Sequence, residues 1–407
     1  MKKIIMCLAL AWNAEAQTDS LDFKIGQMIM IGYSGACVDP NVLDDVSKGK
    51  AGSLLLYERN IPAVNSFAGL KKIIQTYQKA APLPLLITID QEGGKVNRLK
   101  EKYGFPKTVS NAALGKMGSL DSVRFYAECT ASALAGLGIN MNLAPVVDLA
   151  LNPNNPVVVK KERAYSANAD TVTLMAKEMI KAHHRFNVLT VLKHFPGSGS
   201  SNGDTHLDFA EVTKTWSDIE MKPFRQLISA GLVDAILSSH TINRQLDKEG
   251  LPNTLSNTII NGLLRKKLRY DGVVFSDDMQ MLAIANYFGV QEAIRLAING
   301  GIDILTFSNN ISGSPSRTVD TVHAMIKNMV LTGGIPRARI DESFRRIKAL
   351  KKKWAEGNME PLKETVIKQK EIIADQKLRL EKCAPTTSQT GRKKSVGKEK
   401  IKKGNAK

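Results

Sequence analysis

The stretch Val188-Leu-Thr-Val-Leu-Lys-His194 is a short apolar run, rich in β-branched side chains, that ends in two ionisable residues. Similar runs occur along the whole chain, and segments of helical length separate them. The other runs occupy residues 28–32, 51–57, 84–90, 140–148, 235–240, 272–277 and 302–307. Short apolar strands that alternate with helices are typical of βαβ units. The pattern therefore predicts an α/β fold with a parallel sheet.

Several of these runs end in an ionisable residue. The residues at these ends are Asp90, Asp148, Lys193-His194, His240 and Asp277. In a (β/α)8 barrel the C-terminal strand ends form the mouth of the active site, so such side chains converge on one pocket. A doubly wound open sheet is the alternative, but no GxGxxG or phosphate-binding loop follows a predicted strand. We therefore predict a single (β/α)8 TIM barrel, although any one of these polar residues could serve only structure.

Helical periodicity and composition divide the chain into four parts. Amphipathic helices are predicted at residues 122–137, 170–186, 316–331 and 341–353. The barrel is expected to occupy residues 17–356. Residues 357–383 form a charged, helix-prone extension, which either docks on the barrel or pairs with another helix. Residues 384–407 are expected to be a basic, disordered tail.

The first sixteen residues have the layout of a secretory signal peptide. Two lysines precede the apolar run of residues 4–12, and the small residues Ala14 and Ala16 follow it. A buried N-terminal strand is the alternative, but polar residues 17–20 come directly after the run. We therefore expect residues 1–16 to be removed and the protein to be secreted or periplasmic. Later segments lack the ~20 apolar residues of a transmembrane segment.

The strong positive charge is concentrated locally. The chain contains 57 Lys and Arg against 39 Asp and Glu, a formal net charge of +18. From Ala384 onward eight Lys or Arg accompany a single acid, Glu399. Such a tail is expected to be solvated, with weak attraction to anionic surfaces as the functional alternative. A nucleic-acid partner would depend on this tail alone, so none is expected.

Cysteine usage gives no support to a metal site or a disulfide framework. Signal cleavage would remove Cys7, and the remaining Cys37, Cys129 and Cys383 are far apart in the sequence. No CxxC pair or Cys/His cluster has metal-ligand spacing. No metal and no other cofactor is therefore expected.

Three segments carry a specific resemblance. Residues 193–206 read KHFPGSGSSNGDTH, residues 89–98 read IDQEGGKVNR, and residues 275–281 read FSDDMQM. Weaker matches lie at residues 143–148 and 162–165. In their order along the chain the segments resemble family 3 glycoside hydrolases, specifically the single-domain β-N-acetylglucosaminidase branch, over about residues 21–354. Two departures are Ser198, where the family commonly has His, and Ser200-Ser201, in place of a frequent Asp-Thr pair.

The resemblance implies the catalytic residues. A retaining glycosidase needs a carboxylate nucleophile and a group that donates and later accepts a proton. The resemblance assigns Asp277 as the nucleophile, with a helix-capping carboxylate as the alternative. It assigns His206 as the acid/base, held by Asp204, whose charge would orient the imidazole and raise its pKa. Gly197, Gly199 and Gly203 nearby indicate a mobile loop that carries this dyad over the pocket.

The resemblance also implies a set of sugar-binding residues. These are Asp90, Arg98, Arg163, Lys193 and His194, whose polar groups suit a hydroxyl-rich ring. By contrast His183, His184 and His323 lie in helix-like stretches and are interpreted as ordinary helix residues.

These residues predict an exo-acting, retaining β-N-acetylglucosaminidase. Its substrate would carry a terminal β-linked N-acetylglucosamine, in cell-wall fragments or chitooligosaccharides. A β-glucosidase is disfavoured because one barrel lacks the second domain that supplies an acid/base Glu in that branch. Phosphorolysis stays open, since a His acid/base does not repel an incoming phosphate. A non-catalytic sugar-binding barrel would lose Asp277 or the dyad, and this sequence keeps them.

Overall fold

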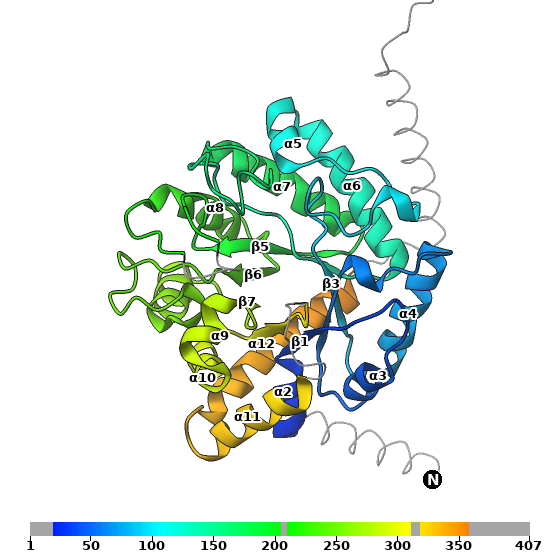
Figure 1. Cartoon of the computed structure of the whole chain (residues 1–407), viewed down its shortest axis with the longest axis vertical. Coiled ribbons are helices and arrows are strands. Elements are labelled where there is room, and N and C mark those ends of the chain that lie inside the picture. Colours follow the sequence, from blue (N-terminus) through cyan, green and yellow to red (C-terminus); the bar gives the residue numbers. More distant parts are fainter. Residues whose placement is uncertain (1–18, 205–209, 311–317, 358–407) are drawn as a thin grey trace, which may run out of the picture.

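Eight parallel strands close into a barrel in the computed structural model, which describes residues 19–204, 210–310 and 318–357 (Figure 1). Each strand pairs with its neighbours in the chain, and β8 pairs with β1 to close the ring. The strands are β1 (Ile29–Gly32), β2 (Ser53–Leu56), β3 (Leu86–Ile89), β4 (Met141–Asn142), β5 (Leu189–Phe195), β6 (Ala235–Ser238), β7 (Val273–Asp278) and β8 (Ile304–Phe307). The predicted (β/α)8 TIM barrel is therefore confirmed. The proposed signal peptide, the basic tail and all but the first residue of the helical extension lie outside the described residues.

Helices surround the barrel and cover the outer face of the sheet (Figure 1). A π-helical segment, Thr258–Lys267, occupies the connection between β6 and β7. The α-helices are α2 (Leu21–Gln27), α3 (Pro40–Ser47), α4 (Ser66–Ala80), α5 (Asn111–Met117), α6 (Leu120–Leu137), α7 (Ala169–Arg185), α8 (Lys222–Ser229), α9 (Leu282–Phe288), α10 (Val290–Gly300), α11 (Val319–Leu331) and α12 (Arg337–Glu356). The four predicted helices correspond to α6, α7, α11 and α12. No helix in the described ranges is long and apolar enough to cross a membrane.

Local sequence signals set the ends of α6. The Ser119 side chain accepts a hydrogen bond from the Ser122 backbone N–H at 3.2 Å, which satisfies one of the first unpaired amides of the helix. At the other end Gly138 adopts φ 90°, a left-handed conformation that glycine takes without a Cβ penalty.

The strands are buried on both faces, which explains why they read as continuous apolar runs. All four residues of β1, β2, β3, β6 and β8 are buried. The run at residues 140–148 is the exception, because β4 is only two residues long. Pro145 has no N–H to donate, and strand-like pairing resumes where Val146 bridges Lys193.

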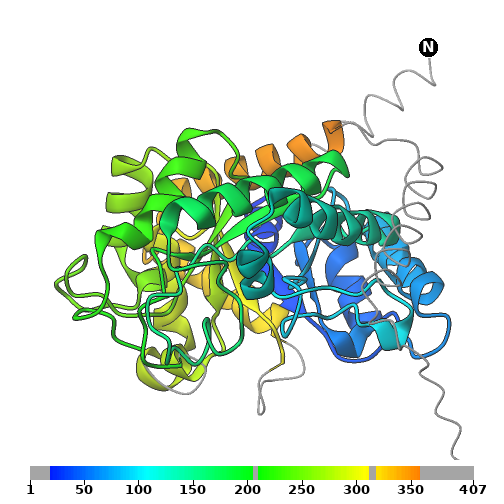
Figure 2. The ribbon, with the colours of Figure 1, turned by 90° about the horizontal axis from the view of Figure 1, so that it is seen from above.

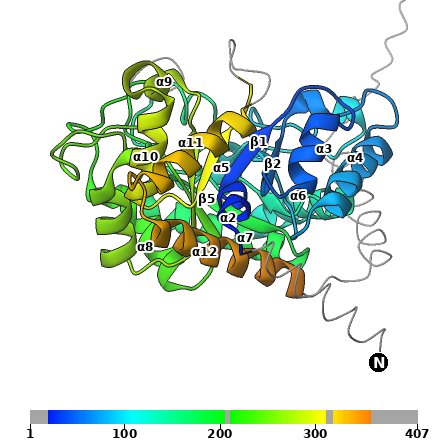
Figure 3. The same ribbon diagram turned by 90° about the horizontal axis from the view of Figure 1, so that it is seen from below.

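One end of the barrel is covered by helices and the other carries the loops. The N-terminal helix α2 packs against α11 and α12, and the Phe23 and Phe344 rings meet edge to face at 6.1 Å. In Figure 2 α12 runs along one side of the molecule, and long loops extend on the opposite side. Figure 3 shows α2 near the end where α12 lies, and α9, which follows β7, at the other end. The C-terminal strand ends therefore open away from α12.

A buried carboxylate, Asp303, fastens α12 and the π-helical segment to β7 and β8. Its side chain is fully buried. Oδ2 accepts from Arg265 at 2.6 Å and from the Val274 N–H at 3.0 Å. Oδ1 accepts from Arg339 at 2.9 Å and lies 3.3 Å from Arg346. One carboxylate thus compensates several buried guanidinium groups, as buried charges require.

The helix α7 docks on the barrel through a buried histidine, His183. The Asn142 amide on β4 contacts His183 Nε2 at 3.0 Å, and His183 Nδ1 donates to the Met179 carbonyl at 2.9 Å. This arrangement fits the neutral ring with its proton on Nδ1. Burial lowers the pKa of His183 to about 4. The interpretation of His183 as a structural helix residue agrees with this packing.

We predict that Asp303→Ala costs about 3–5 kcal/mol of unfolding free energy, because it leaves buried arginines uncompensated. Chemical denaturation followed by circular dichroism measures the change. The matched control is Asp271→Ala, which removes a carboxylate that is 63% exposed and pairs with Arg345 and Arg346. That control should cost at most about 1 kcal/mol. Equal losses in the two variants would contradict the structural role of Asp303.

We predict that His183 makes the protein less stable as the pH falls from about 6.5 towards 4. In this window the unfolded chain takes up a proton that the buried ring does not, so acid favours unfolding. Melting temperatures at pH 7 and pH 4.5 should differ more for the wild type than for His183→Gln, which has no imidazole to titrate. An equal drop in both proteins would refute the assignment.

Candidate active site

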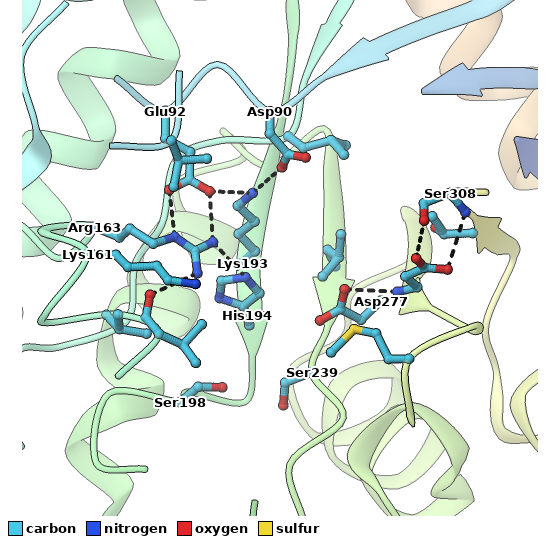
Figure 4. A pocket seen from close by; sticks show the side chains of 18 of the residues that line it. Asp90, Glu92, Lys161, Arg163, Lys193, His194, Ser198, Ser239, Asp277 and Ser308 are labelled. Atoms are coloured by element: carbon cyan, nitrogen blue, oxygen red, sulfur yellow. Dashed lines mark hydrogen bonds and ion pairs between the residues drawn. The ribbon is translucent and has the colours of Figure 1, made fainter. Parts of the chain in front are cut away.

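A polar pocket lies at the C-terminal ends of the strands. Its lining includes six of the eight residues that sequence analysis singled out, namely Asp90, Arg98, Arg163, Lys193, His194 and Asp277. Asp90 directly follows β3, Lys193 and His194 lie in β5, and Asp277 lies in β7. The strand ends thus bring together side chains that are up to 187 positions apart in the sequence. In Figure 4 Asp277 faces Lys193 and His194 across the pocket.

The other two predicted residues belong to the loop after β5. Asp204 directly follows Gly203, which lines the pocket. His206 lies outside the described residues, so its predicted role stays a prediction.

Lys193 forms the centre of a buried ion cluster. Its Nζ lies 2.6 Å from Asp90 Oδ1 and 2.6 Å from Glu92 Oε1, and its side chain is 3% exposed. Arg163 binds Glu92 in a bidentate manner, with both nitrogen–oxygen distances 2.8 Å (Figure 4). Burial alone would raise the pKa of Glu92, but Arg163 and Lys193 hold it well below its ordinary value. The cluster is therefore charged at neutral pH and fixes the side chains that it contains.

His194 is held in one tautomer. Arg163 has only donors, so its Nη2, 3.2 Å away, donates to His194 Nε2. The ring proton then lies on Nδ1 and is donated to Asp148 Oδ2 at 2.6 Å. Asp148 is fully buried, and its Oδ1 accepts from the Ser198 N–H at 2.8 Å. This carboxylate thus joins His194 to the loop that follows β5.

Arg98 lies beside Asp90 in the lining of the pocket. Its Nη2 lies 3.5 Å from Asp90 Oδ2, and its guanidinium stacks over the Tyr57 ring at 5.3 Å. Burial would raise the pKa of Asp90, but Lys193 and Arg98 lower it. Arg98 Nε is buried and has no hydrogen-bond partner among the described residues. This side of the pocket therefore presents an ionised carboxylate, which suits the binding of hydroxyl groups.

The two adjacent aspartates at the end of β7 point in different directions. Asp278 turns to β8, where its carboxylate accepts from the Ser308 N–H at 3.2 Å and from the Ser308 hydroxyl. Both aspartates line the pocket, and Asp277 Oδ1 accepts from the Asp278 N–H at 2.9 Å. Burial raises the pKa of Asp278. The divergence expected for neighbours in a strand is present.

His240 supports this strand end and does not line the pocket. Its Nε2 donates to the Asp278 carbonyl at 3.0 Å, and its Nδ1 contacts the Thr254 hydroxyl at 3.0 Å. Of the strand-end residues, His240 and Asp148 thus lie behind the pocket and orient its members.

Two glycines of the β5 loop serve close packing. A Cβ on Gly197 would lie 2.6 Å from the Glu220 Cβ, and a Cβ on Gly199 would lie 1.8 Å from the Leu149 carbonyl oxygen. Gly197 also adopts φ 115°. We expected these glycines to make the loop mobile, but their positions leave no space for a side chain, so here they permit contact.

Sequence analysis did not assign roles to Glu92, Asp148 or Tyr57. Glu92 lies inside the quoted segment 89–98, and Tyr57 and Asp148 are the last residues of predicted strands. Each position could therefore have indicated a residue at or near the pocket. Among the described residues no group of three His, Cys, Asp or Glu side chains could hold a metal ion.

The chain is similar to known glycosidases over most of its length. A β-hexosaminidase from Tolumonas auensis is 32% identical over 297 residues, which cover 70% of this chain and 84% of that protein. A β-N-acetylglucosaminidase/β-glucosidase from Cellulomonas fimi is 31% identical over 81% of this chain, and the match spans 57% of that longer protein. The structure of a family 3 β-N-acetylglucosaminidase from Paenibacillus superposes with a TM-score of 0.77 at 32% identity, covering 88% of this chain and 68% of that one.

The match to a protein family covers the barrel and every described residue of the pocket. Residues 20–350 match the glycosyl hydrolase family 3 N terminal domain. The resemblance drawn from the three sequence segments is thereby confirmed. The chain belongs to glycosyl hydrolase family 3 and is a glycoside hydrolase.

Proposed function

We propose that the protein is an exo-acting, retaining β-N-acetylglucosaminidase with Asp277 as nucleophile and His206 as acid/base. The observation that carries this proposal is the position of Asp277, whose carboxylate faces the Lys193 and His194 side of the pocket (Figure 4). The adjacent Asp278 also lines the pocket, but its carboxylate is bound to Ser308. A carboxylate opposite a wall of sugar-binding groups suits attack on an anomeric carbon.

The chemistry follows from these positions. The ring hydroxyls would bind to Asp90, Arg98, Lys193 and His194. This binding would place the anomeric carbon against Asp277. Asp277 then forms an ester bond to that carbon while the glycosidic bond breaks, and His206 gives its proton to the leaving oxygen. In the second half, neutral His206 takes a proton from water, and the oxygen of that water displaces Asp277. The sugar leaves with its original anomeric configuration.

The choice of N-acetylglucosamine draws on the relatives. The Tolumonas and Paenibacillus proteins are named a β-hexosaminidase and a β-N-acetylglucosaminidase. The name of the Cellulomonas protein combines β-N-acetylglucosaminidase with β-glucosidase, so glucosides need a direct test. Export, inferred from the layout of residues 1–16, favours cell-wall fragments or chitooligosaccharides as substrates.

One experiment distinguishes the candidate activities. The purified protein is incubated with an aryl β-N-acetylglucosaminide and with the matched aryl β-glucoside, each with and without phosphate. We expect faster release from the N-acetylglucosaminide, and free β-configured N-acetylglucosamine as the first product by NMR. A sugar 1-phosphate would indicate phosphorolysis, an α-configured first product would exclude retention, and preference for the glucoside would refute the substrate assignment.

We predict that Asp277→Asn lowers kcat by at least about 1,000-fold, because an amide cannot form the glycosyl ester and the volume hardly changes. Initial rates on the aryl N-acetylglucosaminide measure this. The melting temperature should stay close to that of the wild type. Activity within tenfold of the wild type in a folded variant would overturn the nucleophile assignment.

We predict that His206→Ala damages turnover of poor leaving groups far more than turnover of activated aryl glycosides, because only the former need protonation. The comparison uses a series of aryl N-acetylglucosaminides whose phenols differ in pKa. With an activated substrate, a burst followed by slow turnover is expected, since water then lacks its base. Asp204→Ala should act in the same direction but less severely. An equal loss on all substrates, without a burst, would move the acid/base to another residue.

A further inference from the structure

The loop after β5 starts from a stem, residues 197–201, that is fixed by two buried carboxylates. Asp148 accepts from the Ser198 N–H at 2.8 Å. Glu220 accepts from the Gly199 N–H at 2.9 Å through Oε2 and from the Ser200 hydroxyl at 2.6 Å through Oε1. Both carboxylates are fully buried. Three donors of the stem, the Ser198 and Gly199 N–H groups and the Ser200 hydroxyl, are therefore paired with buried acceptors.

Glu220 belongs to the same connection as the stem that it binds. It lies in the short 3-10 turn Asp218–Met221, directly before α8, whereas the stem directly follows β5. Gly197 packs against the Glu220 side chain with no room for a Cβ. Glu220 thus joins the first residues of the loop to its last residues, and the predicted dyad Asp204 and His206 lies between these two points.

Other contacts hold the two sides of the loop. On the first side the Asn155 amide donates to the Ser198 carbonyl at 2.8 Å. On the returning side the Val212 N–H donates to the Ile242 carbonyl at 2.8 Å, and the Ile242 N–H donates to the Ala210 carbonyl at 3.0 Å. The described residues on both sides of positions 205–209 are therefore held by the neighbouring loops after β4 and β6.

We propose that Glu220 is a positioning residue, which holds the stem through Gly199 and Ser200 and thereby supports the acid/base step assigned to this loop. This inference rests on the proposed role of His206. Glu220 lies beneath the stem and does not line the pocket among the described residues, so it acts through the loop and not on the sugar.

The environment of Glu220 favours a role as a hydrogen-bond acceptor. Burial raises the pKa of Glu220 to about 7, and the nearby Asp148 acts in the same direction. A glutamine in its place would keep an oxygen for the Gly199 N–H, and its amide could donate to the Ser200 hydroxyl. Alanine would leave both donors buried without an acceptor. The two substitutions therefore separate the hydrogen bonds from the charge.

The test measures kcat and KM for Glu220→Gln and Glu220→Ala on an activated aryl N-acetylglucosaminide and on one with a poor leaving group. Misplacement of a catalytic group by about 1 Å costs on the order of 100-fold. We expect Glu220→Ala to lower kcat by about 10–100-fold on the poor leaving group and much less on the activated one, with KM within about threefold. Glu220→Gln should stay within about threefold of the wild type on both.

Two further variants keep the test decisive. Ser200→Ala removes one of the two hydrogen bonds and should show the same leaving-group selectivity at about 3–10-fold, even if Glu220→Ala does not fold. Glu211→Gln changes an acid of the same loop that is 50% exposed, lies 3.6 Å from Arg244 and accepts from the Thr213 hydroxyl at 2.7 Å, an oxygen acceptor that glutamine keeps. It should change neither constant by more than about twofold.

The outcomes distinguish this inference from the function on which it rests. If His206→Ala shows strong leaving-group dependence but folded Glu220→Ala and Ser200→Ala do not, the positioning role is wrong and the acid/base assignment stands. If Glu220→Ala loses equally on both substrates, Glu220 serves only stability and the inference also fails. If His206→Ala itself shows no leaving-group dependence, the proposed acid/base and this inference fall together.

Discussion

The ammonium group of Lys193, buried between Asp90 and Glu92, is the interaction on which the active site depends. It joins β5 to the loop after β3, and Arg163 joins the same Glu92 to the loop after β4. The desolvation of four charged groups is costly, and mutual pairing at distances of 2.6 to 2.8 Å offsets it. Removal of one member would leave another charge buried and uncompensated. The side chains of this cluster are therefore fixed before any ligand arrives, which reduces the cost of ordering them on binding.

The barrel explains why so much of the pocket lining could be predicted from the sequence. Strands buried on both faces must be apolar along their whole length, so each strand stands out as a run. Parallel closure then brings all C-terminal ends to one side, so Asp90, Lys193 and Asp277 had to converge. The largest overestimate concerns β4, which is two residues long where the apolar run spans residues 140–148; Pro145, three residues after the end of β4, has no N–H to donate to the ladder.

Residues that act through a partner could not be predicted in the same way. Glu220 is one acid in a polar stretch, and its partners Gly199 and Ser200 lie about twenty residues earlier. Asp148 was recognised as a strand-end residue, but its bond to His194 appears only when β4 and β5 are adjacent. Likewise the glycines at 197 and 199 suggested mobility, because glycine favours both flexible loops and close contacts. Sequence spacing does not distinguish a glycine in a flexible loop from one in a close contact. The position of the neighbouring backbone does.

The paired aspartates at the end of β7 show how one strand end both ties neighbouring strands together and contributes to the pocket. Asp278 gives its carboxylate to Ser308 on the β8 side and its carbonyl to His240 after β6, so it ties three consecutive strand ends together. Both aspartates line the pocket, but the Asp278 carboxylate is bound to Ser308, while that of Asp277 faces the Lys193 and His194 side (Figure 4). The Asp277 carboxylate also accepts the N–H of the residue thus fixed. The two positions are therefore not interchangeable: the second aspartate is bound to the β8 side, and the first faces the opposite side of the pocket.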